Sequence, residues 1–433
     1  MDDNLILIFG AILASLIIGI YKKINIGIIA LVFAYIIGCF FMGMKPKAVI
    51  ALWPMKIFFI IMSVSLFYGF ASQNGTLEKL AKQIIYSCRK YPMALPLAIF
   101  AAAHVIAALG AGYFAVMAVV IPIMLAICKQ TKMSIIVGIL ATHGGALSGG
   151  RFVISVGGKI AEELVLNSGF DANYAAHTAL MIYTTVTLYT LLQMGLFFIL
   201  EKQWLVLNVN AAMEKPEPFN KVQRTNLILI GSMIAVLLVP ALLNVLIGTP
   251  EIAAFQKNIN ISFVAIFFAI LSLMCNLGDE KKMISSVPWS TIIMICGIGV
   301  LIKLGVKAGM VVTFSSWVGG NIPESLLAPL MMVIPWGMSF FSSTTGVVMP
   351  TLYPIVPALS DVSTIQAIVF FCIISLGANA AALSPFSSGG SLSLSYCNDE
   401  QTREVLFKKL LLLPFILIAL TVVYGLALVV VLG

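Results

Sequence analysis

Residues 139–158 read ILATHGGALSGGRFVISVGG. The apolar residues around this stretch, at 133–147 and 152–166, together exceed the roughly 20 residues that a membrane-spanning helix needs. Glycine and serine interrupt them at 144–151. Non-helical backbone at membrane depth persists only where protein or a water-filled cavity satisfies its polar groups. The stretch therefore predicts a broken membrane helix beside a functional site.

The composition of the 433-residue chain supports a membrane protein. Apolar residues make up 61% and charged residues 10%, against roughly 45–50% and about 25% in soluble domains. So little charge excludes a cytosolic globular enzyme, a disordered chain and a nucleic-acid-binding protein. We expect a polytopic protein in the lipid bilayer, with no nucleic-acid partner. The net charge of +8 then reflects the loop bias that orients membrane helices.

Apolar runs of spanning or nearly spanning length recur along the chain, and several are shortened or interrupted by Gly, Ser and Pro. They lie at about 4–21, 24–43, 55–73, 92–109, 112–128, 133–147 with 152–166, 173–200, 225–247, 259–277, 288–306, 324–341, 346–360, 364–382 and 404–432. Each run predicts a helix, because backbone N–H and C=O groups in a spanning segment find no water and must hydrogen-bond within the segment.

Two halves of the chain resemble each other. Trp53-Pro54 in the first half and Pro288-Trp289 in the second each open an apolar helix that ends at glycine. Ser148-Gly149-Gly150 precedes Ser155, and Ser388-Gly389-Gly390 precedes Ser395, at an interval of 240 residues. Repeats with broken helices in corresponding positions are typical of secondary transporters.

We therefore predict an all-α polytopic membrane protein built from two inverted repeats of about five spanning helices, each with a re-entrant hairpin and a broken helix. An odd number of spans in each half forces the inversion. The first repeat covers 1–200, with scaffold helices in 4–73, a hairpin at 92–128 and a broken helix at 133–166. A polar linker at 201–224 leads to the second repeat, 225–433, with scaffold helices in 225–306, a hairpin at 324–360 and a broken helix at 364–400.

The charge distribution predicts the orientation. In this topology one face collects 17 of the 25 Lys and Arg residues, which makes it the cytoplasmic face and places both termini outside. The acidic start Met1-Asp2-Asp3-Asn4 lacks the basic region of a signal peptide, so we expect the first run to be a retained helix. The expected location is the inner membrane.

Four polar breaks, at 110–112, 144–151, 342–346 and 384–391, are predicted to meet near the membrane midplane. Broken helices expose N–H groups that favour anions, and these breaks contain no Asp or Glu that would suit an amine. The candidate substrate contacts are hydroxyls, glycine backbone and one arginine. They are Ser148, Gly149, Gly150, Arg151, Ser342, Ser343, Thr344, Thr345, Ser387, Ser388, Gly389 and Gly390.

Arg151 and His143, in or beside the first break, each have two possible roles. Arg151 matches a substrate carboxylate in bidentate geometry. Alternatively it extends to the outer interface or pairs with Glu162 or Glu163. His143 either carries a coupling proton or accepts a substrate hydrogen bond, and the alternative is a packed neutral histidine.

Backbone carbonyls and hydroxyls freed at broken helices suit Na⁺, and the absence of a buried acid favours Na⁺ over H⁺ coupling. The candidate Na⁺ ligands are Gly110, Gly112, Gly145, Thr345, Asn379 and Ser384. The seven cysteines form no CxxC pair, so we expect no other metal. We also expect no organic cofactor and no catalytic residues.

The run Ile139–Gly158 resembles the broken-helix segment of the MatC-type malonate/dicarboxylate carriers. In that family a His-Gly-Ala-x-x-Gly-Gly run leads into Ile-Ser-Val-x-Gly, which here becomes His143–Ala146 with one extra Gly, then Gly149-Gly150 and Ile154–Gly158. The residues Ala107–Ile123 are similar to the family's hairpin, and the match is best over about 25–170.

More loosely, the whole chain resembles the ion-transporter superfamily that includes the divalent anion/sodium symporters. That resemblance implies a homodimer, an elevator-like transport domain, and a dicarboxylate flanked by two sodium sites. Ser342–Thr345 falls where the symporters have a Ser-Asn-Thr tip, and Ala108–Gly112 falls at the first tip without any hydroxyl.

The resulting prediction is a Na⁺-coupled secondary carrier of malonate, malate or succinate that works by alternating access. Open alternatives are a proton-coupled or exchange carrier of citrate, a monocarboxylate or an inorganic oxyanion. A channel would need a continuous polar lining, and an intramembrane enzyme would need an acid pair, an oriented Ser-His dyad or a metal cluster; none of these is evident.

Overall fold

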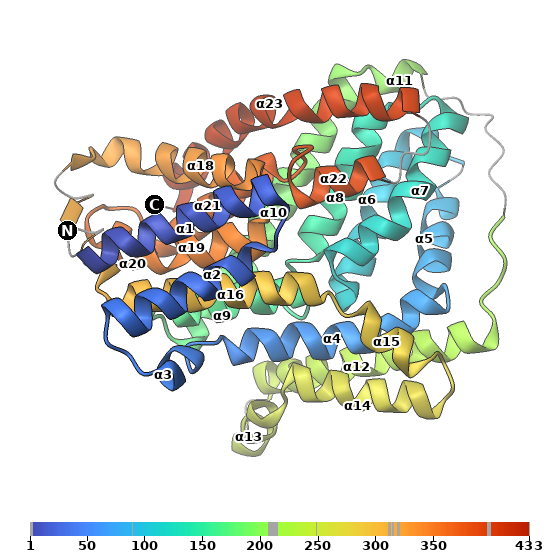
Figure 1. The fold of residues 1–433 in the computed structure, drawn as a ribbon. Coiled ribbons are helices and arrows are strands. Elements are labelled where there is room, and N and C mark those ends of the chain that lie inside the picture. The colour runs from blue at the N-terminus through green and yellow to red at the C-terminus, as the bar shows by residue number, and fades with distance from the viewer. Residues whose placement is uncertain are drawn as a thin grey trace. The chain divides into compact units, whose positions relative to one another are not determined.

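The computed structural model describes residues 3–88, 90–206, 215–247, 249–310, 313, 316, 317, 321–395 and 400–432. In these residues every regular element is a helix and no strand occurs (Figure 1). The predicted all-α fold class is therefore confirmed. The part of the predicted linker at 207–214 lies outside the described residues, as do residues 396–399 of the second predicted broken helix.

The helices of the first half are α1 Asp3–Lys22, α2 Ile26–Ile36, η1 Ile37–Phe41, α3 Pro46–Ile50, α4 Met55–Gln73, α5 Thr76–Ser87, η2 Pro92–Ala94, α6 Leu95–Ile106, η3 Ala107–Ala111, α7 Tyr113–Thr131, α8 Ile135–Gly149, α9 Val156–Asn167, α10 Ala172–Leu200 and α11 Gln203–Val206. Those of the second half are α12 Lys221–Leu246, α13 Pro250–Asn258, α14 Ile261–Met274, α15 Glu280–Ser286, α16 Trp289–Lys307, α18 Glu324–Phe340, η4 Thr344–Val348, α19 Met349–Leu352, η5 Tyr353–Ile355, α20 Val356–Asp361, α21 Ala367–Ala381, α22 Ser388–Ser395 and α23 Glu400–Leu432.

Several helices have the length and composition of membrane spans. Six described helices are each long and apolar enough to cross a membrane. They are Met55–Gln73, Tyr113–Thr131, Ala172–Leu200, Lys221–Pro240, Trp289–Lys307 and Arg403–Leu432. The helices Glu324–Phe340 and Thr344–Asp361 are long and apolar enough only when they are taken together, and the chain bends by 118° at the break between them. This bend lies inside the predicted second hairpin. The chain is a multi-pass membrane protein.

Packing divides the chain into two units. Unit 1 comprises Met1–Phe58, Ile160–Tyr189 and Trp289–Gly433, and unit 2 comprises Phe59–Lys159 and Thr190–Pro288. The first predicted hairpin lies in unit 2 and the second in unit 1. These units group residues by contact, so the division into repeats at 1–200 and 225–433, and the inversion between them, stay predictions.

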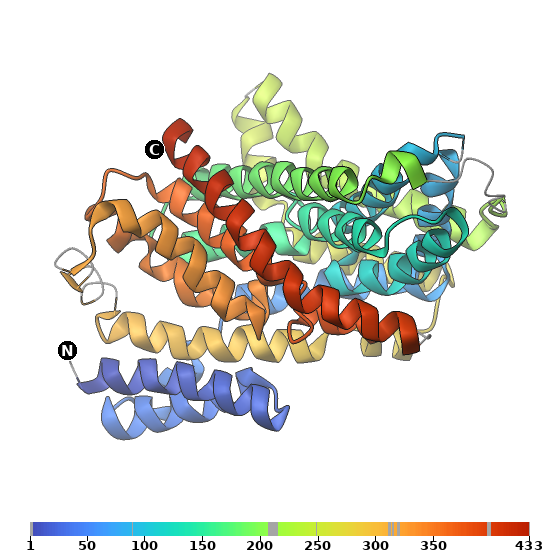
Figure 2. The ribbon, with the colours of Figure 1, turned by 90° about the horizontal axis from the view of Figure 1, so that it is seen from above.

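Unit 1 is built around α21, whose residues are all buried. It packs against α18 and α23 (Figure 2). In the same unit α2 packs against both α1 and α16. Asn25 begins α2 by accepting the amide of Gly27 at 2.9 Å, and its own amide donates to the Ser290 carbonyl at 2.8 Å. A side chain on Gly27 would collide with the Ile293 carbonyl, so glycine allows α2 to approach α16 closely.

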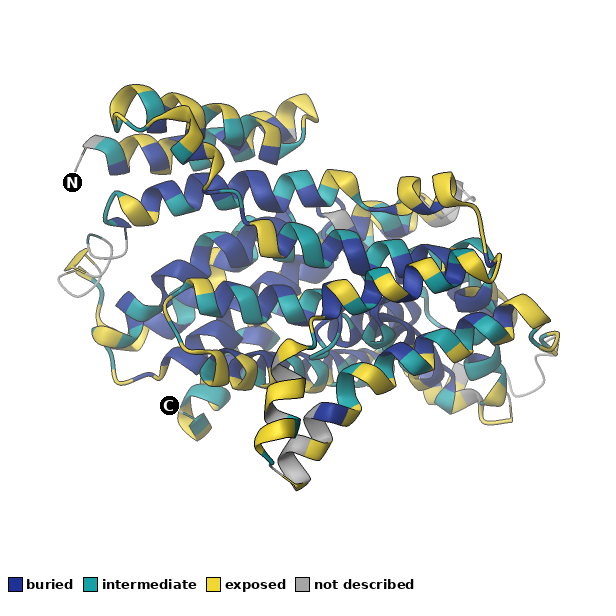
Figure 3. Cartoon of the chain, turned by 90° about the horizontal axis from the view of Figure 1, so that it is seen from below, coloured by how far each residue is buried: buried dark blue, intermediate teal, exposed yellow. Residues whose placement is uncertain are grey.

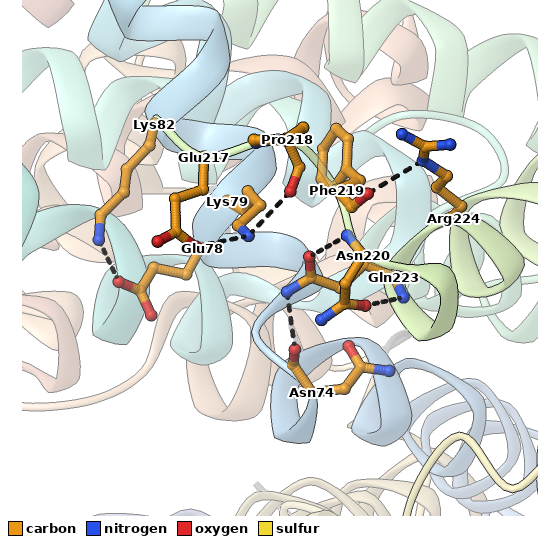
Figure 4. Close-up of polar contacts among 10 residues, drawn as sticks. All are labelled: Asn74, Glu78, Lys79, Lys82, Glu217, Pro218, Phe219, Asn220, Gln223 and Arg224. Atoms are coloured by element: carbon orange, nitrogen blue, oxygen red, sulfur yellow. Dashed lines mark hydrogen bonds and ion pairs between the residues drawn. The ribbon is translucent and has the colours of Figure 1, made fainter. Parts of the chain in front are cut away.

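Unit 2 is built around α8, which is buried from Ile136 to Gly149 and packs against α6 and α7. Residues 215–220, the described part of the linker with no regular structure, end at a capping box (Figure 4). There Asn220 accepts the Gln223 amide at 2.9 Å, and Gln223 Nε2 donates to the Asn74 carbonyl at 3.1 Å. Lys79 Nζ also donates to the Pro218 carbonyl at 3.2 Å, so this part of the linker is bound to the end of α4 and to α5.

Exposed and buried residues alternate along several helices (Figure 3), and many of the exposed residues are large and apolar. In α1, Leu13 and Ile17 are 59% and 57% exposed, whereas Leu5 and Ile8 are buried. An extended apolar surface of this kind is unfavourable in water and is what a helix in lipid presents. The exposed faces therefore agree with the membrane assignment.

Candidate functional site

The structure corrects the expected position of the first broken helix. Residues 144–149, expected to be non-helical, belong to α8, and the interruption lies at 150–155 before α9. The reason is the packing of α6. A Cβ on Gly145 or Gly149 would lie less than 3.0 Å from the carbonyl oxygen of Phe100 or His104, so these glycines serve a close helix contact and not a turn.

The second interruption is displaced in the same way. It lies at 382–387, between α21 and α22, so Gly389 and Gly390 are in the first turn of a helix and not in the expected break at 384–391. Pro385 falls inside the interruption, where it disfavours helix. The side chain of Ser388 lies outside the described part of the structure.

The same turn follows both buried helices. Ser155 Oγ lies 2.6 Å from the carbonyl of Gly150 and 2.7 Å from that of Phe152, and it accepts the Gly158 amide at 3.1 Å. Ser387 Oγ contacts the carbonyls of Ala382 and Ser384, both at 2.7 Å, and accepts the Gly390 amide at 3.3 Å. Each serine therefore satisfies carbonyls left free where the helix ends.

The helix contact before this turn also recurs. Gly145 approaches the Phe100 carbonyl in unit 2, and Gly377 approaches the Met332 carbonyl in unit 1. All of these equivalent positions are 232 residues apart. The Ser-Gly-Gly match at 240 residues is thus out of register with the structural correspondence, which pairs Ser155 with Ser387.

These turns make a stability prediction. Ser155→Ala and Ser387→Ala should each lower the free energy of unfolding by about 1–2 kcal/mol, because buried carbonyls and an amide lose their partner. Thermal unfolding in detergent measures this. The control is Ser285→Ala, whose hydroxyl is exposed and donates to the Lys282 carbonyl. Equal melting temperatures for all three variants would contradict the role assigned to the turns.

The first hairpin break lies where the sequence predicts it. Gly110 and Gly112 have φ values of 109° and 78°, a region that favours glycine. Gly110 is buried against the ring of Tyr68. A Cβ on Gly112 would meet nothing within 4 Å, so the break has open space beside Gly112.

Unit 2 has one histidine on α6, His104, and one on α8, His143. His104 Nδ1 is 2.9 Å from Ser148 Oγ, which also donates to the Gly144 carbonyl at 2.7 Å. His143 is 3% exposed, and its Nδ1 is 2.7 Å from Tyr113 Oη. Sequence reasoning missed Tyr68 and Tyr113 as site residues. For Tyr113 the available signal is its position directly after Gly112.

Arg151 is the largest fully buried side chain of the described residues, at 2% exposure. Its guanidinium is therefore enclosed by protein. Glu163, expected as an alternative partner, forms an ion pair with Lys56 at 3.4 Å in unit 1.

The hydroxyls of the second hairpin tip bond within unit 1. Ser342 Oγ donates to the Met338 carbonyl at 2.6 Å, and Ser343 Oγ accepts the Gly346 amide at 3.1 Å. Thr344 Oγ1 lies 3.0 Å from Ser339 Oγ and 3.4 Å from the Ala378 carbonyl. The tip is thus brought beside the end of α21, while the predicted Thr345 adjoins it on η4.

Asn379 lies next to Ala378 near the end of α21. It is 4% exposed, and neither its amide oxygen nor its amide nitrogen has a hydrogen-bond partner among the described residues. Ser384 Oγ accepts the Phe386 amide at 3.2 Å. The predicted Na⁺ ligands Thr345, Asn379 and Ser384 therefore all belong to the tip and turn of unit 1, and Gly110, Gly112 and Gly145 belong to unit 2.

Among the described residues, no group of three or more His, Cys, Asp and Glu side chains could hold a metal ion.

The chain is similar to one family model and to solved structures of transporters. Residues 1–150 match the family model described as the dicarboxylate carrier protein MatC N-terminus. The crystal structure of the Alcanivorax borkumensis YdaH transporter matches at a TM-score of 0.54 and 15% identity, over 88% of this chain and 87% of that one. The Neisseria gonorrhoeae MtrF structure is a weaker match, at 0.49 and 14%, over 86% and 81%. No curated protein sequence matches the chain.

The family match covers α1 to α8, including the first hairpin break, and ends at Gly150. The YdaH match extends the shared fold over most of the chain. The expected resemblance to MatC-type carriers is confirmed over residues 1–150, which match the family model described as the dicarboxylate carrier protein MatC N-terminus.

Proposed function

We propose that this protein is a Na⁺-coupled secondary carrier of small dicarboxylates of the malonate, malate or succinate type. The observation that carries the proposal is the family match over the region that contains the first hairpin and α8. The acid-free polar breaks support it, because a site without carboxylates suits an anionic substrate.

The hydrogen-bond directions support sodium as the coupling ion. Ser384 Oγ acts as an acceptor for the Phe386 amide, and a hydroxyl oxygen keeps a second lone pair. Asn379 adds an amide oxygen without a partner. Oxygen lone pairs bind a hard cation. The proposed Na⁺ ligands are drawn from Gly110, Gly112, Gly145, Thr345, Asn379 and Ser384.

Several further features belong to the same proposal because they follow from the family resemblance or the charge pattern. They are elevator-type alternating access, a homodimer, and an inner-membrane location with both termini outside. The proposed substrate contacts are Arg151 with Ser148–Gly150 in unit 2, and Ser342–Thr345 with Ser387–Gly390 in unit 1.

The decisive experiment is uptake of labelled malonate and succinate into proteoliposomes. We expect uptake with an inward Na⁺ gradient and none with choline plus a proton gradient. Absence of uptake under both gradients, with protein that melts cooperatively, would reject the dicarboxylate assignment. Uptake driven only by protons would reject sodium coupling.

Proton coupling through His143 is the second candidate. It is favoured by one observation: His143 Nε2 is buried and has no hydrogen-bond partner among the described residues. A proton-driven carrier would lose coupling, but retain exchange of labelled for unlabelled substrate, when His143 is replaced by glutamine. A sodium-driven carrier would retain coupling in that variant.

A further inference from the structure

The short helix α3 of unit 1 combines exposed lysines with exposed apolar side chains. The lysines are Lys45, the N-cap of α3, and Lys47 within it. The apolar side chains are Phe40 and Phe41 on η1 and Ile50 on α3, and Phe40 and Ile50 are 71% and 73% exposed. We propose that these five residues, the α3 patch, bind an anionic phospholipid through its headgroup and the adjoining part of its acyl chains.

Packing within unit 1 brings η1, α3 and the end of α16 together. A Cβ on Gly38 in η1 would lie 2.8 Å from Val49 Cγ2 in α3 and 3.4 Å from Leu304 Cδ1 in α16. Met44 donates its amide to the Gly38 carbonyl at 2.8 Å, which ties the segment before Lys45 to η1. The exposed side chains of η1 and α3 therefore belong to one surface of this unit.

The lysines of the α3 patch have no protein partner. The ammonium groups of Lys45 and Lys47 form no ion pair or hydrogen bond with any residue that the structure describes. Lys307, in the last turn of α16 and one turn beyond Leu304, is exposed and equally unpaired among these residues. Lys56 differs, because its Nζ lies 3.4 Å from Glu163 Oε1. Three positive charges are thus available to an anion.

The elements that carry these lysines hold no opposing charge. No Asp or Glu occurs between Asn4 and Leu77, and none occurs in α16. Glu163 contacts Lys56, so its charge is already matched. A net-negative headgroup at the α3 patch would therefore meet only positive side chains on η1, α3 and α16.

The apolar side chains favour a lipid over a water-soluble anion. Tyr35, itself exposed, packs edge-on against Phe40 with ring centroids 5.7 Å apart. Aromatic residues gather at the headgroup level of a membrane, and lysines bind lipid phosphates there as point charges. A phospholipid satisfies both halves of the patch, because its phosphate reaches the lysines while its chains cover the rings and Ile50. A zwitterionic headgroup carries its own cation and gains less from the lysines.

The test titrates the purified full-length protein, in a neutral detergent, with phosphatidylglycerol or phosphatidylcholine. Native mass spectrometry counts the bound lipids and gives an apparent Kd. Each lysine near an anionic lipid is expected to change the affinity about fivefold. Wild type should therefore bind phosphatidylglycerol about twentyfold more tightly than phosphatidylcholine. The double variant Lys45→Gln/Lys47→Gln should lose most of this preference and bind phosphatidylcholine as wild type does.

A second double variant tests the apolar half of the patch. Phe40→Ser/Ile50→Ser should weaken the binding of both lipids to a similar extent, because the acyl chains are common to both. The matched control is Lys281→Gln/Lys282→Gln. These lysines are also exposed, but they follow Asp279 and Glu280, whose charges offset theirs. The control should keep the wild-type preference, and all three variants should melt as wild type does because every replaced side chain is exposed.

Two results would overturn the lipid site. One is equal affinity of wild type for the two lipids, and the other is equal phosphatidylglycerol affinity of wild type and Lys45→Gln/Lys47→Gln. Glycerol phosphate, which has the phosphate without acyl chains, should leave the melting temperature of wild type unchanged. Stabilisation by glycerol phosphate that the lysine variant loses would instead assign the patch to a soluble anion. All readouts are binding or melting, so the outcome does not depend on the proposed substrate or coupling ion.

Discussion

Replacing Gly145 by alanine should lower the free energy of unfolding by about 3 kcal/mol, near the upper end for overpacked cores. The added Cβ would lie less than 3.0 Å from the Phe100 carbonyl oxygen. That oxygen belongs to the backbone of α6, so relief requires the two helices to separate. Gly377→Ala should have a similar effect in unit 1, where the obstacle is the Met332 carbonyl.

Thermal and denaturant unfolding of the purified protein measure this effect. The matched control is Gly195→Ala in α10, where a Cβ would meet nothing within 4 Å. Alanine is a better helix former than glycine by about 1 kcal/mol, so the control should be unchanged or slightly stabilised. A Gly145→Ala protein as stable as this control would show that α6 and α8 do not pack as closely as described.

Replacing Arg151 by leucine should reduce kcat/KM for a dicarboxylate by roughly a hundredfold, with the protein still folded. Loss of a hydrogen-bonded charge partner costs about 2–5 kcal/mol, and about 1.4 kcal/mol corresponds to tenfold. Leucine is chosen because Leu383 occupies the position 232 residues later, in a turn with the same hydrogen bonds. The equivalent turn therefore accommodates leucine.

Initial rates of uptake at varied substrate concentration separate binding from turnover in this variant. Arg224→Leu is the control, since Arg224 is exposed and donates to the Phe219 carbonyl at 2.9 Å; its KM should equal that of wild type. An Arg151→Leu protein with unchanged KM would remove Arg151 from the substrate site. A misfolded variant is recognised by its melting curve, and Arg151→Lys then provides the comparison.

The positions of the breaks show where prediction from the sequence succeeded and where it did not. The tip at Gly110–Gly112 was predictable because two glycines flank one residue inside an apolar hairpin. The break after α8 was placed too early, because Gly144, Gly145 and Gly149 look like turn residues. Glycine serves a turn and a close helix contact equally well. Only the position of the α6 backbone distinguishes the two uses.

The register of the repeat has the same explanation. Ser-Gly-Gly triplets match at 240 residues, but the serines that cap the turns match at 232. Ser155 precedes Val156 and a glycine pair, whereas Ser387 directly precedes the triplet Ser388-Gly389-Gly390, on which the 240-residue match was based. Short motifs of small residues do not identify the serine that bonds to the freed carbonyls.

The sequence by itself determined the class of this protein. Its apolar runs and scarcity of charge are compatible only with a helical membrane protein, and the run from Ile139 to Gly158 pointed to the carrier family that the N-terminal match supports. The tertiary structure alone decided that Tyr68 and Tyr113 belong to the first break, together with His143. These residues come from three helices, and hydrogen bonding between distant segments leaves no periodic trace in a sequence. Apolar burial follows composition and spacing, whereas polar contacts depend on where each helix lies.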